Sequence, residues 1–324
     1  MTANFPESAA QRDEWVLAKR PSRRSLNPYE PYAFFVEEEC GAGGHPESVA
    51  TIFLTNRECP FRCTMCDLWR NTLTESAPIG AIPQQIDFAL KRLAPARSVK
   101  LYNSGSFFDP RAIPLEDYEA IAARVLDFDR VIVECHPAFV GSRCVTLRNL
   151  LRGRLEVALG LETVHPEVLA KLNKRMTLDE FAAAAGFLRS HEIDARVFVL
   201  VEPPFMKAEE ALYWTQQSLD FAFDCGAIAA TLIPTRGGNG AMESLAEAGL
   251  FESPRLSLLE HSAAYGLKLR RGRVFADLWD LQRGRECPHC FDARLQRLKE
   301  INRCQTLASA VRCDACGGQL GVEA

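Results

Sequence analysis

Three cysteines lie within eight residues of one another, at Cys59, Cys63 and Cys66, with the spacing C-x3-C-x2-C. They directly follow an apolar, strand-like run, residues 51–55. An odd number of thiols packed this tightly cannot all pair as disulfides, so the pattern indicates metal ligation. Thiolates are the usual protein ligands of iron–sulfur clusters, and three of them on a four-iron cube would leave one iron open. A zinc site is the alternative, although zinc sites usually show two C-x2-C pairs and this segment has one.

The spacing resembles that of the radical S-adenosylmethionine (SAM) enzymes, in which an apolar or aromatic residue precedes the third cysteine, as Met65 does here. The resemblance implies that Cys59, Cys63 and Cys66 hold a [4Fe–4S] cluster whose open iron binds SAM. It also implies that one electron cleaves SAM to methionine and a 5′-deoxyadenosyl radical, which abstracts hydrogen from a substrate. The protein then supplies binding and orientation. A flavodoxin- or ferredoxin-type reductant is implied by the one-electron step.

Strand-like and helix-like stretches alternate from residue 49 to residue 240. This alternation predicts an α/β fold with a parallel sheet and helical crossovers. Six such units are too few to close an eight-fold barrel. We therefore predict an open (β/α)6 partial barrel, which is also what the resemblance implies, with the site at the carboxyl ends of the strands. The expected strands are residues 49–55, 98–102, 130–133, 155–160, 195–201 and 228–233, and the expected helices are residues 83–93, 115–126, 178–189 and 209–223.

The chain of 324 residues is long enough for this barrel and one small appendage. We expect residues 1–48 to form an amino-terminal arm and a hairpin strand, residues 49–250 the barrel, and residues 251–324 a carboxy-terminal module. No apolar run approaches the ~18 residues of a membrane span. Twelve cysteines and a start without the pattern of a secretory signal predict a cytoplasmic protein.

Polar residues that follow the expected strands are the candidates for SAM contacts. In radical SAM enzymes a glycine-containing segment after the second strand meets the methionyl amine, and a polar residue on the fourth strand meets the ribose or the amine. The resemblance therefore implies contacts from Gly105, Ser106 and Glu162. The other candidates for cofactor or substrate contacts are Met65, Asn103, Ser104, Glu134, Arg196 and Arg236. For each carboxylate, a helix cap or a salt bridge is the alternative.

Four stretches resemble one branch of the superfamily, the archaeosine-forming radical SAM family, whose wider relatives include the radical SAM subunit of Elongator. They are YNSGSFFDPRAIP (102–114), ALGLET (158–163), LNKRMTLDEF (172–181) and VFVLVEPPFM (197–206). That family acts on a modified deazaguanine in transfer RNA. The tail cysteines cannot be mapped onto that family, so its substrate is not carried over.

The tail contains two C-x2-C pairs, Cys287/Cys290 and Cys313/Cys316, separated by 22 residues. This layout predicts a four-thiolate metal site, with zinc or a second iron–sulfur cluster as occupant. Cys304 lies between the pairs and could replace one ligand. Residues 268–312 hold eleven Lys or Arg against five Asp or Glu. This excess suits either RNA or a solvated helix surface, and Arg294, Arg297 and Lys299 are the candidates for such a surface.

The sequence therefore predicts a radical SAM enzyme whose substrate is open, with a modified nucleoside in RNA as one class. One alternative is a radical SAM modifier of a small molecule or peptide that uses an auxiliary iron–sulfur cluster. The other is a zinc-dependent RNA-binding protein that is not an enzyme.

Overall fold

The computed structural model describes residues 5–281, 286–316 and 318–320. Its centre is one eight-stranded sheet whose strands neighbour each other in chain order. β1 runs antiparallel to β2, as the predicted hairpin requires, and every later pair is parallel. The strands are β1 (Ala33–Cys40), β2 (Pro46–Phe53), β3 (Ser98–Tyr102), β4 (Arg130–Cys135), β5 (Arg154–Glu162), β6 (Asp194–Val201), β7 (Ala229–Pro234) and β8 (Arg273–Ala276).

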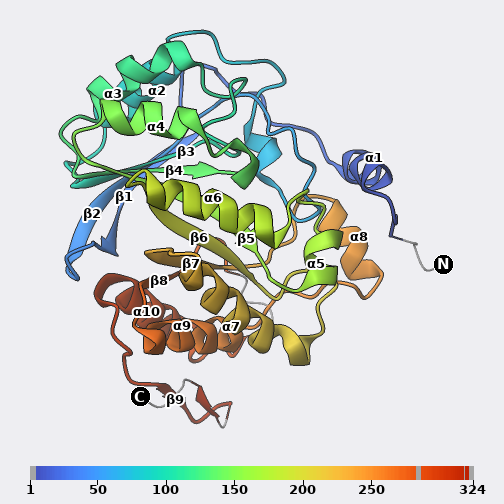
Figure 1. The fold of residues 1–324 in the computed structure, drawn as a ribbon. Helices are drawn as coiled ribbons and strands as arrows, with labels where there is room; N and C mark the ends of the chain where they lie inside the picture. Colours follow the sequence, from blue (N-terminus) through green and yellow to red (C-terminus); the bar gives the residue numbers. More distant parts are fainter. Residues whose placement is uncertain (1–4, 282–285, 317, 321–324) are drawn as a thin grey trace.

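Helices connect the parallel strands and cover the outer face of the curled sheet (Figure 1). This arrangement confirms the α/β partial barrel. The α6 helix begins with a capping box, in which the side chains of Thr177 and Glu180 each accept from the other's backbone N–H group. The helices of the barrel are α2 (Ala81–Leu90), α3 (Tyr118–Arg124), α4 (Ser142–Leu150), α5 (Pro166–Lys171), α6 (Leu178–Ser190), α7 (Ala208–Asp224), α8 (Ala241–Glu247) and α9 (Leu256–Leu269), with 3-10 turns η1 (Leu68–Asn71), η2 (Leu115–Asp117) and η3 (Pro137–Phe139).

The two faces of the sheet have different linings, because successive residues of a strand point to opposite sides. Leu101 and Val197 belong to the hydrophobic core between the sheet and the helices. Their neighbours Tyr102 and Phe198 therefore face the concave side, as does Phe53 of β2. The ring centroids are 6.0 Å apart for Phe53 and Tyr102 and 6.2 Å apart for Tyr102 and Phe198. Aromatic rings thus line part of the barrel interior.

The sheet contains one parallel strand that the sequence did not predict. β8 pairs with β7 from Ala229 opposite Arg273 to Leu232 opposite Ala276, so the sheet continues past residue 250. Four residues that directly follow a basic run and a glycine give too short a periodic signal for a prediction from the sequence. The α10 helix (Phe291–Cys304) packs against both β1 and β8, the two edges of the sheet. It therefore closes the open side of the barrel.

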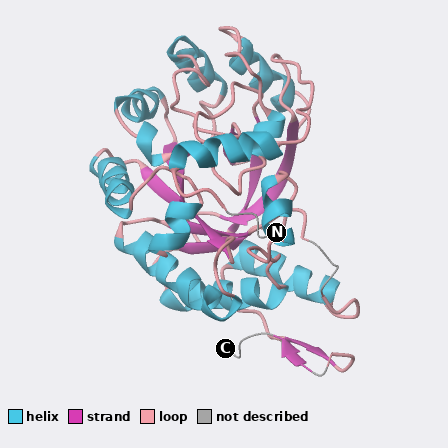
Figure 2. Cartoon of the chain, turned by 90° about the vertical axis from the view of Figure 1, so that its right-hand side faces the viewer, coloured by secondary structure: helices cyan, strands magenta, loops and turns pink. Residues whose placement is uncertain are grey.

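The carboxy-terminal segment ends in a two-stranded hairpin of β9 (Val311–Cys313) and β10 (Gly318–Leu320). The hairpin projects from the body of the molecule in Figure 2. Among the described residues, no helix combines the length and the apolar character needed to cross a membrane.

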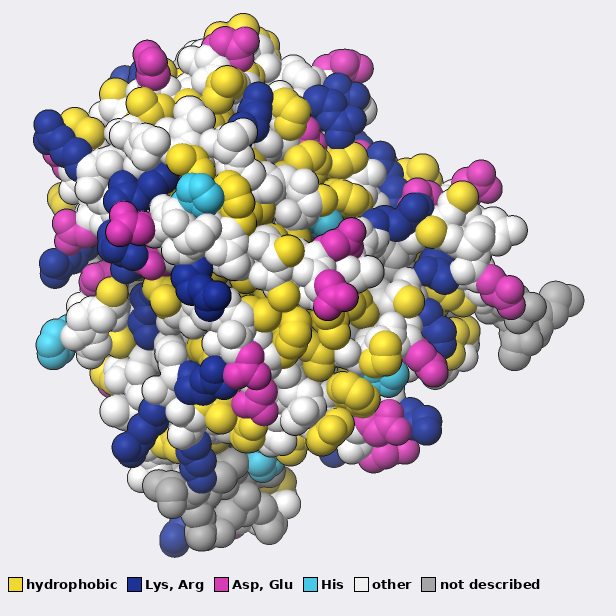
Figure 3. All heavy atoms as spheres, viewed as in Figure 1, with side chains coloured by type: hydrophobic (Ala, Val, Ile, Leu, Met, Phe, Trp, Pro, Cys, Tyr) yellow, Lys and Arg dark blue, Asp and Glu magenta, His cyan; other side chains and the backbone are white. Residues whose placement is uncertain are grey.

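Two arginines of α10 lie elsewhere than the sequence predicted. Arg294 and Arg297 are buried, and they hold the buried carboxylate of Glu260 in α9 at 2.7 and 3.3 Å. A buried acid on another helix is not visible in the sequence pattern, so a solvated surface was the wrong expectation for these two residues, whereas Lys299 of the same helix is exposed as expected. On the face drawn in Figure 3, Lys and Arg side chains lie among acidic and apolar ones.

Candidate functional site

The loop that carries Cys59, Cys63 and Cys66 follows the carboxyl end of β2, where ligand sites form in parallel α/β sheets. All three cysteines are partly buried. Burial, with a smaller contribution from the neighbouring thiols, raises the pKa of each thiol to about 12. These groups would therefore remain protonated at neutral pH unless a metal compensates the thiolate charge. The donor set, three thiols on one buried loop, fits an iron–sulfur cluster.

Neighbouring loops hold the backbone of the cysteine loop in place. The N–H of Thr64 donates to the carbonyl of Leu172 at 2.9 Å. The side-chain amide of Asn239, after β7, donates to the carbonyls of Thr64 and Cys66 at 2.8 and 3.1 Å. Asn239 is buried and its amide oxygen accepts from the N–H of Met242. Sequence reasoning did not select Asn239, since a lone asparagine in a glycine-rich turn carries no signal of its own.

The segment after β3 approaches the cysteine loop closely, as expected for Gly105. A Cβ atom on Gly105 would lie 3.3 Å from the Cβ of Cys59. Glu134, at the end of β4, accepts from the N–H groups of Asn103 and Gly105 at 2.6 and 3.4 Å. Burial raises the pKa of Glu134 to about 7, although these N–H groups partly oppose the rise. The structure thus brings Cys59, Asn103, Gly105 and Glu134 together.

Two serines of the same segment join it to other strand ends. The Ser104 hydroxyl lies 2.8 Å from the Tyr32 hydroxyl, and Ser104 adopts a left-handed φ of 54°. Ser106 accepts from the N–H of His136 at 2.9 Å. Within the described part of the chain, neither amide atom of the buried Asn103 side chain has a hydrogen-bond partner. A turn with left-handed backbone and unpaired polar atoms is typical of a binding site.

A buried ion pair also lies near the cysteine loop. Lys174 Nζ donates to Glu162 Oε1 at 2.7 Å, and both side chains are buried. Glu162 ends β5 with a left-handed φ of 69°. The ammonium also acts on Cys59 and Cys63, because its charge lowers the pKa of both thiols against the larger effect of burial. Sequence reasoning selected Glu162 and missed Lys174.

His136 forms a second contact with the cysteine loop. Its ring stacks on Phe61, which lies between Cys59 and Cys63, with ring centroids 3.8 Å apart. Its Nδ1 accepts from the N–H of Ala138, so Nε2 carries the proton and donates to the carbonyl of Lys174 at 2.9 Å. Burial lowers the pKa of His136 to about 3, and the charge of Lys174 adds to this effect. The imidazole is therefore neutral and positions the loop.

Two further predicted residues lie at the edge of this site. Met65 packs against a small apolar cluster that includes Leu172 and Leu200. Arg236 pairs with Asp277 and donates to the carbonyl of Trp279 at 2.9 Å.

Arg196 lies away from the cysteine loop, contrary to the expectation of a cofactor or substrate contact. Its guanidinium is buried and pairs with Glu156 at 2.6 Å and with Glu39 at 3.2 Å. Glu156 is near the start of β5, and Glu39 also binds Lys100. Arg196 therefore belongs to an ion network inside the barrel, toward the amino ends of the strands. The sequence showed a charge on a strand but not the two carboxylates that neutralise it.

The four tail cysteines converge. The sulfur atoms of Cys287, Cys290, Cys313 and Cys316 all lie within 4.8 Å of one another. Cys287 Sγ and Cys313 Sγ are 3.9 Å apart. One tetrahedral zinc ion with Zn–S bonds of about 2.3 Å would separate its sulfurs by about 3.8 Å. The Cys304 thiol instead contacts Glu300 Oε1 at 3.1 Å.

Comparison with known proteins gives distant matches. No family model matches the chain. An uncharacterized protein of Methanocaldococcus jannaschii is 24% identical over 254 residues, which cover 74% of this chain and 69% of that protein. Archaeosine synthase subunit beta of Methanosarcina acetivorans is 27% identical over 208 residues, or 61% of this chain and 60% of that protein.

Solved structures also match at low similarity. The radical SAM methyltransferase TsrM of Kitasatospora setae gives a TM-score of 0.44 at 17% identity, covering 56% of this chain and 36% of that one. Elp3 of Methanocaldococcus infernus gives 0.47 at 13% identity, covering 60% and 50%. Coproporphyrinogen III oxidase of Escherichia coli gives 0.43 at 9% identity, covering 83% and 56%. Of these solved structures, TsrM and coproporphyrinogen III oxidase are radical SAM enzymes, and the curated relatives include an archaeosine synthase subunit.

Proposed function

We propose that this protein is a radical SAM enzyme. The observation that carries the proposal is the placement of three thiols on one loop at the carboxyl end of β2, in contact with Gly105 of the next strand end. When bound, a [4Fe–4S] cluster at these thiols supplies the electron that cleaves SAM and so generates the radical that abstracts hydrogen. The chain's own task is to hold the three thiolates, seat SAM beside them and exclude water.

The residues around the loop suit that task. Ser104 and Gly105 place backbone groups beside Cys59, where the methionyl amine of SAM would lie. Glu134 fixes this segment by accepting from its N–H groups. Near the loop, Lys174 also offers a positive charge and Glu162 a carboxylate, which suit the carboxylate and hydroxyl groups of SAM.

The test is anaerobic reconstitution of the full chain with iron and sulfide. We expect about four irons per chain at the loop, as one [4Fe–4S] centre requires. Electron paramagnetic resonance of the reduced protein should change when SAM is added, because SAM would bind the open iron. A reconstituted protein that binds iron without any response to SAM would contradict the proposal.

For the substrate we propose a modified nucleoside in RNA. A planar base would suit the aromatic rings of Phe53, Tyr102 and Phe198 inside the barrel. The relative named archaeosine synthase subunit beta also supports a nucleoside. Incubation with bulk transfer RNA, SAM and reductant, followed by nucleoside mass spectrometry, tests this step. If SAM were cleaved while every nucleoside stayed unchanged, a small molecule or a peptide would be favoured as the substrate.

For the tail cysteines we propose one zinc ion. Sulfurs within 4.8 Å of one another suit a single ion, whereas a four-iron cube carries its thiolates on different metal atoms and so spreads them further. This spacing supports zinc over an auxiliary cluster, and we propose a structural role for the module. All twelve cysteines are free of disulfides, which supports a reducing compartment such as the cytoplasm. A flavodoxin- or ferredoxin-type protein would supply the electron there.

A further inference from the structure

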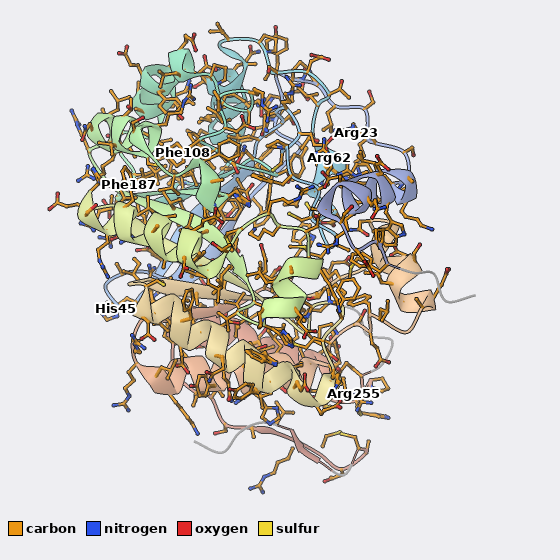
Figure 4. The ribbon with its side chains drawn as sticks, turned by 45° about the vertical axis from the view of Figure 1, so that its right-hand side comes forward. Arg23, His45, Arg62, Phe108, Phe187 and Arg255 are labelled. Atoms are coloured by element: carbon orange, nitrogen blue, oxygen red, sulfur yellow. The ribbon has the colours of Figure 1, made fainter. Side chains whose placement is uncertain are left out.

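Three arginines converge on Glu58, the residue directly before Cys59. Arg20 Nη1 donates to Glu58 Oε1 at 2.7 Å, and Arg23 pairs with Oε2. Arg62, within the cysteine loop, lies 3.0 Å from Oε1. Arg20 and Arg23 belong to the amino-terminal arm, residues 8–24, which includes α1 (Ala9–Lys19). Figure 4 shows Arg23 and Arg62 near each other beside α1.

The same arginines extend from Glu58 to the backbone of the loop. Arg62 Nη1 donates to the carbonyls of Cys59 and Phe61 at 2.6 and 3.1 Å. Arg23 Nη1 donates to the carbonyl and hydroxyl of Thr72 at 3.0 and 2.6 Å. The carboxylate therefore joins the start of the loop, at Cys59, to its end, at Thr72.

The arm also packs against a buried side chain. The Arg20 guanidinium lies 4.5 Å from the ring of Trp69, which is only 4% exposed. Such a cation–π contact strengthens when both partners are shielded from water. Trp69 is in η1, directly after the third cysteine, so this contact also fixes the loop.

A second link joins α1 to the loop through Asn173. Its side-chain amide donates to Asp13 Oδ1 at 2.7 Å and to the carbonyl of Arg62 at 2.9 Å. At the end of α1, the carbonyl of Lys19 lies so near Gly240 that a Cβ atom there would clash with it. The arm is thus packed between the loop and the β7 exit.

We propose that the arm is a clamp on the cysteine loop, in which Arg20, Arg23 and Glu58 are positioning residues for Cys59. The clamp holds the first ligand cysteine in the geometry that a cluster needs and limits opening of the loop. The identity of the bound group rests on the proposed function, but the restraint on Cys59 does not. The two ideas can therefore fail separately.

The first test follows the cluster in full-length holoprotein exposed to air, by the decay of its visible absorbance. Glu58→Gln and the double variant Arg20→Met/Arg23→Met should bleach about tenfold faster than the wild type, because lost charge-assisted bonds let the loop open more often. The matched control is Glu260→Gln, a buried carboxylate held by Arg294 and Arg297 away from the loop. It should bleach at the wild-type rate.

The second test needs no cluster. In the cluster-free full chain, N-ethylmaleimide labelling of Cys59, read by peptide mass spectrometry, should also rise about tenfold in both clamp variants. Labelling of Cys225, which follows α7, should not change and serves as the internal reference. If Cys59 were labelled in both clamp variants no faster than in the wild type, the clamp would be overturned. A wild-type protein that binds no iron would instead overturn the proposed function, while the labelling result would still decide the clamp.

Discussion

The ammonium of Lys174 lies 2.7 Å from Oε1 of Glu162, and both side chains are buried beside the cysteine loop. The pair also acts on the cysteine loop, because the ammonium reaches Cys59 and Cys63 electrostatically. Burial alone would lower the pKa of Lys174, but the attraction of Glu162 and the two cysteines outweighs it and raises that pKa. Lys174 therefore remains charged next to the thiolates.

Removing the lysine should lower the free energy of unfolding more than removing the carboxylate does. In the cluster-loaded protein, where the metal keeps the three thiols deprotonated, Lys174→Met leaves Glu162 as a buried, unpaired charge beside the thiolates, which should lower the free energy of unfolding by about 3–5 kcal/mol. Glu162→Gln leaves Lys174 with the thiolates as partners and should cost less. Chemical denaturation of both variants and of the double variant measures this. Equal losses would show that the lysine and the thiolates do not interact.

The same carboxylate should matter for SAM. Glu162→Ala should weaken SAM binding about 10–150-fold, the loss expected for a charge-assisted hydrogen bond of ~1.5–3 kcal/mol. Equilibrium binding to cluster-loaded protein measures the change, with iron content as the control for an intact site. Unchanged affinity in a fully loaded variant would remove Glu162 from the SAM site.

Gly160 leaves the space that this ion pair occupies. A Cβ there would lie 2.6 Å from Lys174 Nζ and would also clash with Glu162 Oε1. Gly160→Ala should therefore destabilise the protein by about 1–3 kcal/mol. The control is Gly186→Ala in α6, where no atom lies within 4 Å of the added Cβ. It should stabilise the helix by about 0.5–1 kcal/mol. Thermal denaturation compares the two, and a stabilising Gly160→Ala would contradict the packing described.

The raised pKa of Glu134 predicts that the stability of the fold depends on pH. Burial raises its pKa to about 7 from an ordinary value of 4.5, so between these values the folded protein binds more protons than the unfolded chain. The free energy of unfolding should then fall as pH rises through this window, by on the order of 2 kcal/mol. Glu134→Gln cannot titrate and should lack this fall. Urea denaturation of both proteins at the two ends of the window measures the difference; parallel pH profiles would refute the shift.

The predicted strands from residue 49 to residue 233 and the cysteine ligands follow from periodicity and spacing, which are local in the sequence. The contacts that organise the site are not local. Asn239 and Lys174 reach the cysteine loop from other connections, and Arg20 reaches Glu58 across 38 positions. The partners of Arg196 are also distant in the sequence, because Glu156 reaches it from the neighbouring strand β5 and Glu39 from β1 across the curved sheet.

Metal analysis distinguishes zinc from iron at the four tail cysteines. The wild type should hold one zinc per chain at Cys287, Cys290, Cys313 and Cys316, and Cys287→Ser/Cys290→Ser should hold none and lose order in the module. Iron should stay near four per chain in both proteins after reconstitution. About eight irons and no zinc in the wild type would show that the tail binds a second cluster instead.

The most direct test of the radical SAM assignment is the formation of 5′-deoxyadenosine from SAM under dithionite, measured by chromatography with mass detection. Reconstituted wild-type protein should form 5′-deoxyadenosine and methionine in equal amounts. The Cys59→Ala/Cys63→Ala/Cys66→Ala variant should form none, while Cys287→Ser/Cys290→Ser should retain its iron at the loop. A triple variant that still produced 5′-deoxyadenosine, or a cluster-loaded wild type that produced none, would contradict the account.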